Sequence, residues 1–433
     1  MRYQQFIFKD YSFDEGNKLL KLSYGLDNSL DFSETYKFDF DFARYDPAAL
    51  DRALQTLSIM AGISYFKTYL PPEVVIKKAN LSEEDASFFA KTYQRGLGEF
   101  LYTNQLDPQK SFNFPIGPGS PQPIDINLQA GQLIAIGGGK DSLVSVELLR
   151  NQPRVATWSV GHHSQLEPLV NQIGLKHFWV ERIWDKQLLE LNQNDAYNGH
   201  VPISAIFACV GTVVAILSGY RDVVVSNESS ASEPNLTYQG VPINHQYSKS
   251  LEFEKDFQNY LARHFSNGPR YYSFLRPLSE LRISDIFAKI AFEKYKDVFS
   301  SCNRAFTHDS NHLFWCGVCP KCAFTFLALT PFVPRDRLEG LWSGKNLLLD
   351  PSLESTYKQL LGIEGDKPLE CVGEIKEARA AMNLAKKQYP ELEKYQYQIP
   401  EGYDYKTIGP HSMPPELFDI LNSATGQTSK QPG

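Results

Sequence analysis

The sequence has no surplus of positive charge. Its 43 lysine and arginine residues are outnumbered by 50 aspartate and glutamate residues, so the formal net charge is −7 at pH 7. Proteins that bind nucleic acids in general present a basic surface, because they neutralise phosphates. The acidic balance therefore argues against a nucleic-acid partner. It leaves room for a local basic pocket that holds a phosphorylated small molecule.

The sequence also lacks a targeting or membrane segment that stands out. Residues 1–6 contain no apolar core like that of a signal peptide. The uncharged stretch 203–220 is close to membrane length, but small and hydroxyl residues interrupt it and a second apolar run follows at 223–225. A buried helix that leads into a central strand accounts for both runs better than a membrane span. We therefore expect a cytoplasmic protein without a membrane partner; no feature indicates an oligomeric state.

Cysteine is scarce and unevenly placed. Four of the six cysteines are crowded into one short stretch, as Cys302, Cys316, Cys319 and Cys322. A secreted domain held by disulfides would spread its cysteines over the fold. Four thiolates on a tight loop suit a structural zinc site, with reduced buried thiols and an iron–sulfur cluster as alternatives. Of the other two cysteines, Cys209 lies in an apolar stretch and is expected in the core, and Cys371 stands alone.

A cluster of proline and glycine at 115–123 predicts a domain boundary. Before it, alternating apolar and polar residues predict a small antiparallel sheet up to about residue 43, and helical spacing predicts one helix from Pro47 and another from Ser82 to Leu101. The predicted parts are an N-terminal α+β domain (1–125), a central domain (126–332) and a C-terminal extension (333–433) with a disordered tail from about 423.

Strands and helices alternate in the central domain. Strands are predicted at 132–136, 154–160, 177–182, 222–226 and 271–275, and helices at 142–151, 164–173, 201–219, 247–265 and 279–296. This alternation is typical of an α/β fold with a doubly wound parallel sheet, whose ligands gather at the carboxyl ends of the strands.

The most informative stretch joins a predicted strand to a predicted helix and consists of Gly137, Gly138, Gly139, Lys140, Asp141 and Ser142. Glycines let the backbone turn sharply, and the amides at a helix N-terminus bind anions. A Walker P-loop would need glycine at position 134, where Ile134 stands, and serine or threonine directly after the lysine. The stretch resembles instead the pyrophosphate loop of the PP-loop ATP pyrophosphatases, with Gly137 where most of that superfamily has serine. The alternative is a glycine-rich turn without a ligand.

Two clusters of polar residues, 226–232 and 244–250, follow later in the central domain. In the first, Glu228 can hold Mg²⁺ on the phosphates of ATP. In the second, His245 has an ordinary pKa suited to proton transfer, although a single histidine is often structural. Lys249 can meet a carboxylate or a diphosphate. The alternative for both clusters is a solvated loop.

Three further polar residues are candidates. Arg276 can meet a carboxylate or a diphosphate. Arg304 lies two residues from Cys302, so a metal loop would position it. His200 precedes Pro202 near a predicted helix start, where a structural role is as plausible as a catalytic one.

These segments together resemble one family, the UDP-N-acetylmuramoyl-L-alanyl-L-glutamate epimerases (MurL family). The resemblance covers most of residues 55–332 and rests on 61–67, 96–100, 137–142, 198–202, 226–232, 244–250, 276–281, 301–306 and 315–322. It implies an enzyme of peptidoglycan synthesis. Such an enzyme uses ATP and Mg²⁺ to invert the terminal L-glutamate of UDP-MurNAc-L-Ala-L-Glu, and it releases AMP and diphosphate.

The resemblance also implies roles for the candidate residues. The loop 137–142 would hold the phosphates of ATP, with Mg²⁺ at Asp141 or Glu228. His245 and Lys249, together with Glu228, are the expected catalytic residues, which handle the proton and stabilise the oxyanion. The residues expected to bind the substrate are Asn227, Arg276, Arg304 and His200. The N-terminal domain would cover the UDP-sugar.

Two other functions remain open from the sequence. A PP-loop amidating or thiolating enzyme that acts on a deazapurine or on tRNA would share the glycine loop and the cysteine spacing, which resembles the zinc loop of 7-cyano-7-deazaguanine synthase. The acidic charge and the long N-terminal part argue against it. The third possibility is a nucleotide-binding module without enzymatic activity.

Overall fold

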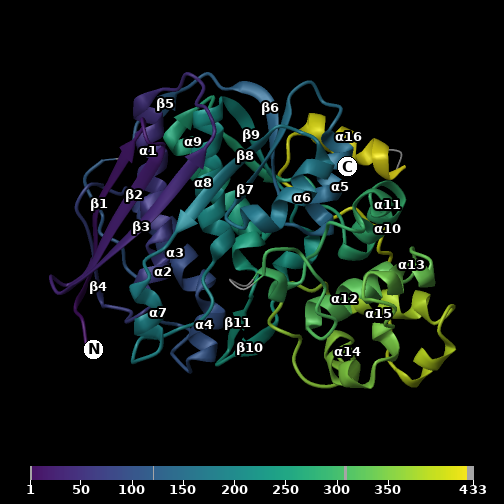
Figure 1. Ribbon diagram of the computed structural model, residues 1–433. Helices are drawn as coiled ribbons and strands as arrows, with labels where there is room; N and C mark the ends of the chain where they lie inside the picture. Colours follow the sequence, from purple (N-terminus) through teal and green to yellow (C-terminus); the bar gives the residue numbers. More distant parts are fainter. Residues whose placement is uncertain (1, 120, 307–309, 427–433) are drawn as a thin grey trace.

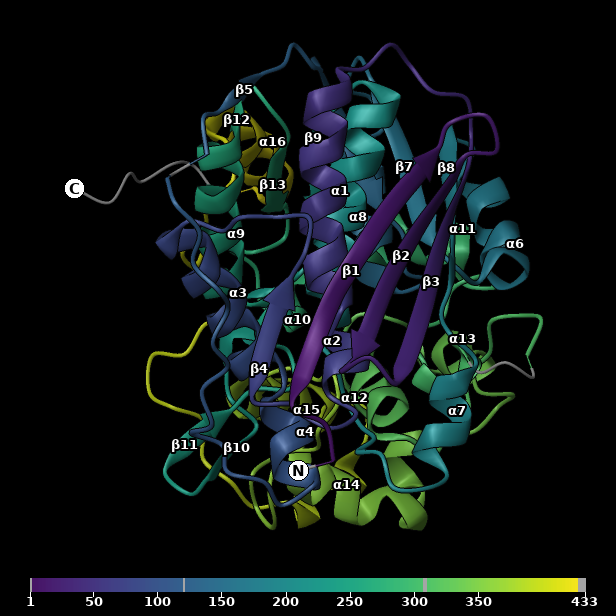
Figure 2. The same cartoon turned by 90° about the vertical axis from the view of Figure 1, so that its left-hand side faces the viewer.

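The structure is a computed structural model that describes residues 2–119, 121–306 and 310–426. Its centre is a nine-stranded sheet with the strand order β13-β9-β6-β7-β8-β3-β2-β1-β4 (Figures 1 and 2). The fold is α/β, as predicted. The parallel strands are β6 (Gln129–Ala135), β7 (Val155–Val160), β8 (His177–Ile183), β9 (Tyr220–Val225) and β13 (Arg270–Ser273).

The N-terminal strands continue this sheet. The strands β1 (Gln5–Asp14), β2 (Leu19–Leu26) and β3 (Leu30–Asp39) are antiparallel to one another, and β4 (Glu73–Ile76) lies parallel to β1. Because β3 pairs with β8, they are not the separate small sheet that we expected. The sheet thus crosses the boundary predicted near residue 125. The division into domains there stays a prediction.

Alternate residues of the parallel strands face two different cores. Leu133 and Val223 pack into one core, whereas their neighbours Ile134 and Val224 pack into the other. Both faces of the parallel part are therefore covered, as in a doubly wound sheet. The first core contains helices α1 (Pro47–Ala61), α2 (Ile63–Phe66), α3 (Glu83–Gly96), α4 (Gly98–Thr103), α8 (Ile203–Ser218) and α9 (Leu251–His264).

The second core is built by helices from the centre and the end of the chain. They are α5 (Lys140–Leu149), α6 (His163–Ile173), α10 (Glu280–Ile290), α11 (Phe292–Tyr295), α12 (Pro320–Leu329), α13 (Arg335–Gly340), α14 (Glu354–Leu360), α15 (Ile375–Ala385) and α16 (Pro415–Thr425). Figure 1 shows α12 to α15 on the opposite side of the molecule from β1 to β4.

The remaining elements are short. They are α7 (Gln187–Asn192), β5 (Ile124–Asp125), β10 (Leu236–Tyr238), β11 (Val241–Ile243), β12 (Phe265–Ser266), η1 (Ser229–Ser232), η2 (Tyr247–Lys249), η3 (Asn303–Phe306), η4 (Leu347–Leu349), η5 (Pro351–Leu353) and η6 (Pro390–Lys394).

The uncharged stretch 203–220 is a buried helix followed by a strand, as expected. The helix α8 lies between α1 and the sheet (Figure 2). It approaches the sheet closely at Gly211, where a Cβ atom would lie only 2.7 Å from Val223 Cγ1 and 2.8 Å from Trp158 Cζ2. Within the described residues, no helix is long and apolar enough to cross a membrane.

Two predicted helices are each divided in the structure. The helix predicted at 279–296 is interrupted at Ala291, which separates α10 from α11. The helix predicted from Ser82 to Leu101 is broken at Leu97, which separates α3 from α4. The tail predicted to be disordered from about 423 begins inside α16, which ends at Thr425. The rest of that tail, from 427 on, lies outside the described residues.

Candidate active site

The glycine loop connects β6 to α5 at the carboxyl end of the parallel strands. Gly138 has a φ of +87°, a conformation that favours glycine. A Cβ atom there would lie 3.0 Å from Phe306 Cζ and 3.1 Å from the carbonyl oxygen of Ser300. Gly139 is the N-cap of α5, and no described side chain caps this helix. The amides of its first turn thus have no side-chain cap, and anion binding there stays a prediction.

Lys140 points into the protein. Its ammonium group, which is nearly fully buried, forms ion pairs with Asp141 and Glu280. Burial alone would lower the pKa of Lys140, but the two carboxylates outweigh burial and hold the pKa above its usual range. The lysine that we expected to contact phosphates thus anchors two acidic side chains. The hydroxyl of Ser142 donates to the carbonyl oxygen of Gly139, 3.1 Å away, and so stabilises the turn.

Three carboxylates converge beside this loop. Oxygen atoms of Asp141, Glu228 and Glu280 all lie within 4.8 Å of one another. Burial and the negative charge of Glu280 raise the pKa of Asp141 to about 6. Carboxylate oxygens are the ligands that Mg²⁺ takes in proteins, and a divalent cation would relieve the repulsion within the cluster. The donor set therefore fits Mg²⁺. We call these three residues the carboxylate cluster.

A second group of ionisable side chains surrounds Cys371, in the loop between α14 and α15. Lys249 Nζ lies 3.1 Å from Cys371 Sγ, and His245 hydrogen-bonds the same sulfur. The other side of the His245 ring contacts Glu99 through Nδ1. Lys321 donates from Nζ to the carbonyl oxygen of Cys371. We call Cys371, Lys249, His245 and Glu99 the thiol cluster.

The charges in the thiol cluster follow from these contacts. Burial would lower the pKa of His245, but its hydrogen bonds to Cys371 and Glu99 raise it to about 9. Contact with Cys371 likewise outweighs burial for Lys249 and holds its pKa above the usual range. Burial would raise the pKa of Cys371, but Lys249, His245 and Lys321 lower it to about 6. At neutral pH Lys249 and His245 are therefore cations and Cys371 is a thiolate.

His200 lies at the edge of the same cluster. Its ring centroid is 4.6 Å from that of His245, and its Nδ1 is 3.6 Å from Glu99 Oε2. Burial and the neighbouring His245 lower the pKa of His200 to about 4. This imidazole is therefore neutral and weakly basic at neutral pH.

The other predicted substrate residues are not gathered at one point. Arg276 is buried and directed at protein groups: it pairs with Glu254 at 3.0 Å and donates to the carbonyl oxygens of Glu228 and Lys249. Contrary to our expectation, it positions two site residues instead of facing a substrate. Arg304 is exposed and makes no ion pair with any described residue. Asn227 is half-buried and follows β9.

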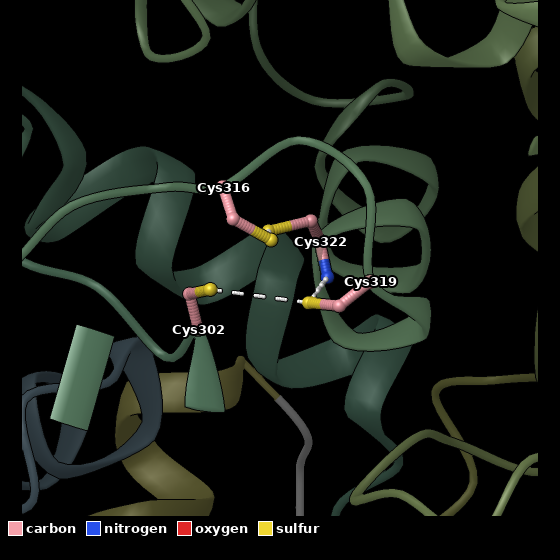
Figure 3. A group of neighbouring side chains, drawn as sticks. All are labelled: Cys302, Cys316, Cys319 and Cys322. Carbon is pink, nitrogen blue, oxygen red and sulfur yellow. Dashed lines mark hydrogen bonds between the residues drawn. The ribbon is translucent and has the colours of Figure 1, made fainter. Parts of the chain in front are cut away.

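The four crowded cysteines do converge. Their sulfur atoms lie within 4.8 Å of one another, and their side chains point toward a common centre (Figure 3). Cys302 Sγ lies 3.9 Å from Cys319 Sγ, and Cys316 Sγ lies 3.7 Å from Cys322 Sγ. Four thiolates bound to one zinc ion at about 2.3 Å would be about 3.8 Å apart. The donor set and its size therefore fit a structural zinc ion.

Comparison with known proteins identifies the family. The family model described as the MurL N-terminal domain matches residues 1–274, and the MurL C-terminal domain matches residues 298–397. The chain belongs to the MurL family. Both parts of the match are needed to build the site, because the carboxylate cluster and Lys249 precede residue 298, whereas the cysteines and Cys371 follow it.

Three relatives bear the name UDP-N-acetyl-alpha-D-muramoyl-L-alanyl-L-glutamate epimerase. The proteins from Xanthomonas oryzae pv. oryzae and Micromonospora sp. are each 38% identical over 390 residues, covering 87% and 86% of this chain and 84% and 86% of the relatives. The protein from Salinispora tropica is 36% identical over 456 residues, covering 100% of this chain and 98% of the relative. The match to MurL proteins supports an epimerase over an amidating or thiolating PP-loop enzyme.

Four residues in or beside the two clusters were not predicted from the sequence: Glu99, Glu280, Lys321 and Cys371. Glu99 and Glu280 lay inside segments that carried the family resemblance, so a signal was present. Lys321 stands between Cys319 and Cys322, and the spacing of the cysteines predicts metal ligands but no role for the lysine. Cys371 had no neighbouring motif, because its partners come from segments more than a hundred residues away, except for Lys321.

Proposed function

We propose that the protein epimerises the terminal L-glutamate of UDP-MurNAc-L-Ala-L-Glu in an ATP-dependent reaction that releases AMP and diphosphate. Membership of the MurL family supports the epimerase activity and the substrate. The observation that carries the ATP-dependent chemistry is the carboxylate cluster beside an uncapped helix N-terminus, with the thiol cluster next to it.

Activation by ATP solves a problem of charge. The α-proton beside an ionised carboxylate is hard to remove, because deprotonation would place two negative charges together. Transfer of AMP to the carboxylate removes its charge and makes the acyl group an electron sink. A base can then take the proton, and the enolate needs a positive or hydrogen-bonding partner. Return of a proton to the opposite face inverts the centre, and hydrolysis of the mixed anhydride releases AMP.

The residues of the glycine loop and the carboxylate cluster would carry out the activation. The amides of Gly139 to Ser142 would bind phosphate oxygens. Asp141, Glu228 and Glu280 would hold Mg²⁺, which shields the charge of the phosphates when bound. A shallow cavity of about 470 Å³ at the end of β7 includes His162 and Gln165 and would take the nucleoside of ATP. Phe306, which contacts both Gly138 and His162, joins the cavity to the loop.

The four cysteines would hold zinc as a structural ion behind the glycine loop. The segment that leads to Cys302 touches this loop: the amide of Ser300 donates to the carbonyl oxygen of Gly138 at 3.0 Å. A Cβ atom at Gly139 would lie 3.2 Å from Ser301 Cβ. A fixed cysteine loop would therefore keep the glycine loop in its binding conformation.

The proposal is tested by incubating the protein with ATP, Mg²⁺ and UDP-MurNAc-L-Ala-L-Glu in deuterated water. We expect AMP and diphosphate, with deuterium at the glutamyl α-carbon of the D-product. UDP-MurNAc-L-Ala, which has no glutamyl residue, is the control and should release no diphosphate above background. Absence of both diphosphate and deuterium with the full substrate would refute the proposal.

A further inference from the structure

The proposed function requires a base for the α-proton, and the residues predicted for that task are poorly suited to it. With its pKa raised to about 9, His245 is protonated at neutral pH, and Lys249 is also held as a cation. A protonated side chain can stabilise an oxyanion, but it cannot accept a proton. His200 is neutral, yet its pKa of about 4 makes it a weak base.

Cys371 lies between the two cations. Its sulfur is hydrogen-bonded by Lys249 at 3.1 Å and by His245, and Lys321 binds its backbone carbonyl. Thiols paired with lysine or imidazolium groups exist as thiolates near neutral pH. Building on the proposed function, we propose that the Cys371 thiolate is the catalytic base that removes the α-proton of the activated glutamyl residue.

The thiol also lies close to the carboxylate cluster, where the substrate would be activated. Lys321 connects the two clusters, because its Nζ is 3.9 Å from Glu280 Oε1 and also binds the carbonyl oxygen of Cys371. The negative charges of Glu228 and Asp141, as well as that of Cys371, raise the pKa of Lys249. An acyl group activated at the glycine loop could therefore present its α-carbon to the sulfur.

Contacts with Glu233 and Asn235, which lie between η1 and β10, hold the loop that carries Cys371. Asn235 Nδ2 donates to the carbonyl oxygen of Pro368 at 2.8 Å, and Lys367 pairs with Glu233 at 2.6 Å. Cys371 itself is half-buried, as a group that must meet a substrate should be. Cys209 is buried in α8, and the other four cysteines form the proposed zinc site, so none of these five is available as a base.

The step balances without any further reactant. The Cα–H bond breaks, the proton moves to Cys371 Sγ to form a thiol, and the electron pair moves into the enolate of the acyl adenylate. The ammonium of Lys249 and the imidazolium of His245 are placed to stabilise the charge. Water on the opposite face donates the proton that restores the Cα–H bond, and the thiol returns its proton to the solvent, which neutralises the hydroxide left behind.

The test compares Cys371→Ser with Cys209→Ala, which removes the buried thiol away from the site. Two half-reactions are followed: exchange of labelled diphosphate into ATP, which reports adenylation, and deuterium uptake at the α-carbon. Cys371→Ser should lower deuterium uptake about 10²–10⁴-fold and leave diphosphate exchange within a few-fold of the original protein. Cys209→Ala should retain both. Retained diphosphate exchange would also show that the variant is folded.

A second measurement uses the unchanged protein. Iodoacetamide near pH 7 should alkylate Cys371 first, and the alkylated protein should lose deuterium uptake but keep diphosphate exchange. Normal deuterium uptake by Cys371→Ser, loss of both half-reactions in both experiments, or a substrate thioester trapped on Cys371 would overturn the inference. If the unchanged protein itself shows no ATP-dependent epimerisation, the proposed function fails first.

Discussion

Two neighbouring clusters of ionisable side chains differ in how their charges are arranged. The carboxylate cluster brings three acidic side chains together around one buried lysine, Lys140. The thiol cluster surrounds one sulfur with the cations Lys249 and His245. Three carboxylates side by side suit a metal cation and the phosphates that come with it, whereas two cations beside one sulfur suit a thiolate and a developing enolate. Under the proposed function, one cluster would activate the substrate and the other would invert it.

The largest expected effect comes from removing the support that both clusters share. Cys316→Ser should abolish zinc binding, and because the cysteine loop contacts Gly138 and continues into Lys321, it should eliminate adenylation and proton exchange together. We expect the Tm to fall by about 10 °C or more, since binding energy at a structural zinc site is folding energy. Zinc content and thermal unfolding measure this change.

Val318→Ser, in the same loop but exposed, is the matched control and should keep its zinc, its Tm and both half-reactions. A Cys316→Ser protein with both half-reactions intact would show that the cysteine loop is not needed by either cluster.

The next effect separates the two clusters. Asp141→Asn should lower diphosphate exchange and deuterium uptake alike, by about 10²–10³-fold, because proton removal depends on prior adenylation. This differs from the pattern expected of Cys371→Ser, which spares adenylation. Asp419→Asn, at an exposed position of α16, is the control. Deuterium uptake by Asp141→Asn at the original rate would mean that inversion does not need activation at the carboxylate cluster.

The two clusters also differ in how well the sequence predicts them. Asp141 and Ser142 belong to one contiguous motif whose turn conformation follows from its glycines, so the glycine loop could be predicted without a structure. Cys371 could not, because its pKa depends on Lys249 and His245, more than a hundred residues earlier in the chain. A local sequence pattern does not predict contacts between residues so far apart in the chain.

The fold shows the same limit. The alternation of strands and helices predicted the α/β class, since it depends on local periodicity. The pairing of β3 with β8 depends on contacts between residues far apart in the sequence, such as Phe38 and Val180, and it was not predicted. For the same reason the sequence predicted a substrate contact for Arg276 and did not predict its buried ion pair with Glu254.

The smallest expected effect concerns pH. It tests the thiol cluster through the change that His245→Gln makes, because the pKa values of Asp141 and Cys371 are both about 6. The thiolate is the active form of Cys371, whose pKa is about 6, so deuterium uptake should rise with pH up to about 6 and then level off. It should fall again above about 9, where His245 loses its proton. The charged groups that face the sulfur are Lys249, His245 and Lys321. His245→Gln removes one cation and should move the acid limb upward, toward the ordinary thiol pKa of about 8.5. Each unit of that movement lowers deuterium uptake at about pH 5, below the acid limb, by about tenfold.

In His245→Gln the pH profile of diphosphate exchange should match that of the original protein, because the carboxylate cluster is unchanged. His312→Gln, at an exposed position, is the control and should leave the pH profiles of both half-reactions unchanged. An acid limb that moves equally in both half-reactions would place the titrating group in the carboxylate cluster. An acid limb that stays at about 6 in His245→Gln would mean that His245 does not set the charge of Cys371. The two clusters can therefore be told apart, because diphosphate exchange depends on the carboxylate cluster alone, whereas deuterium uptake depends on the thiol cluster as well.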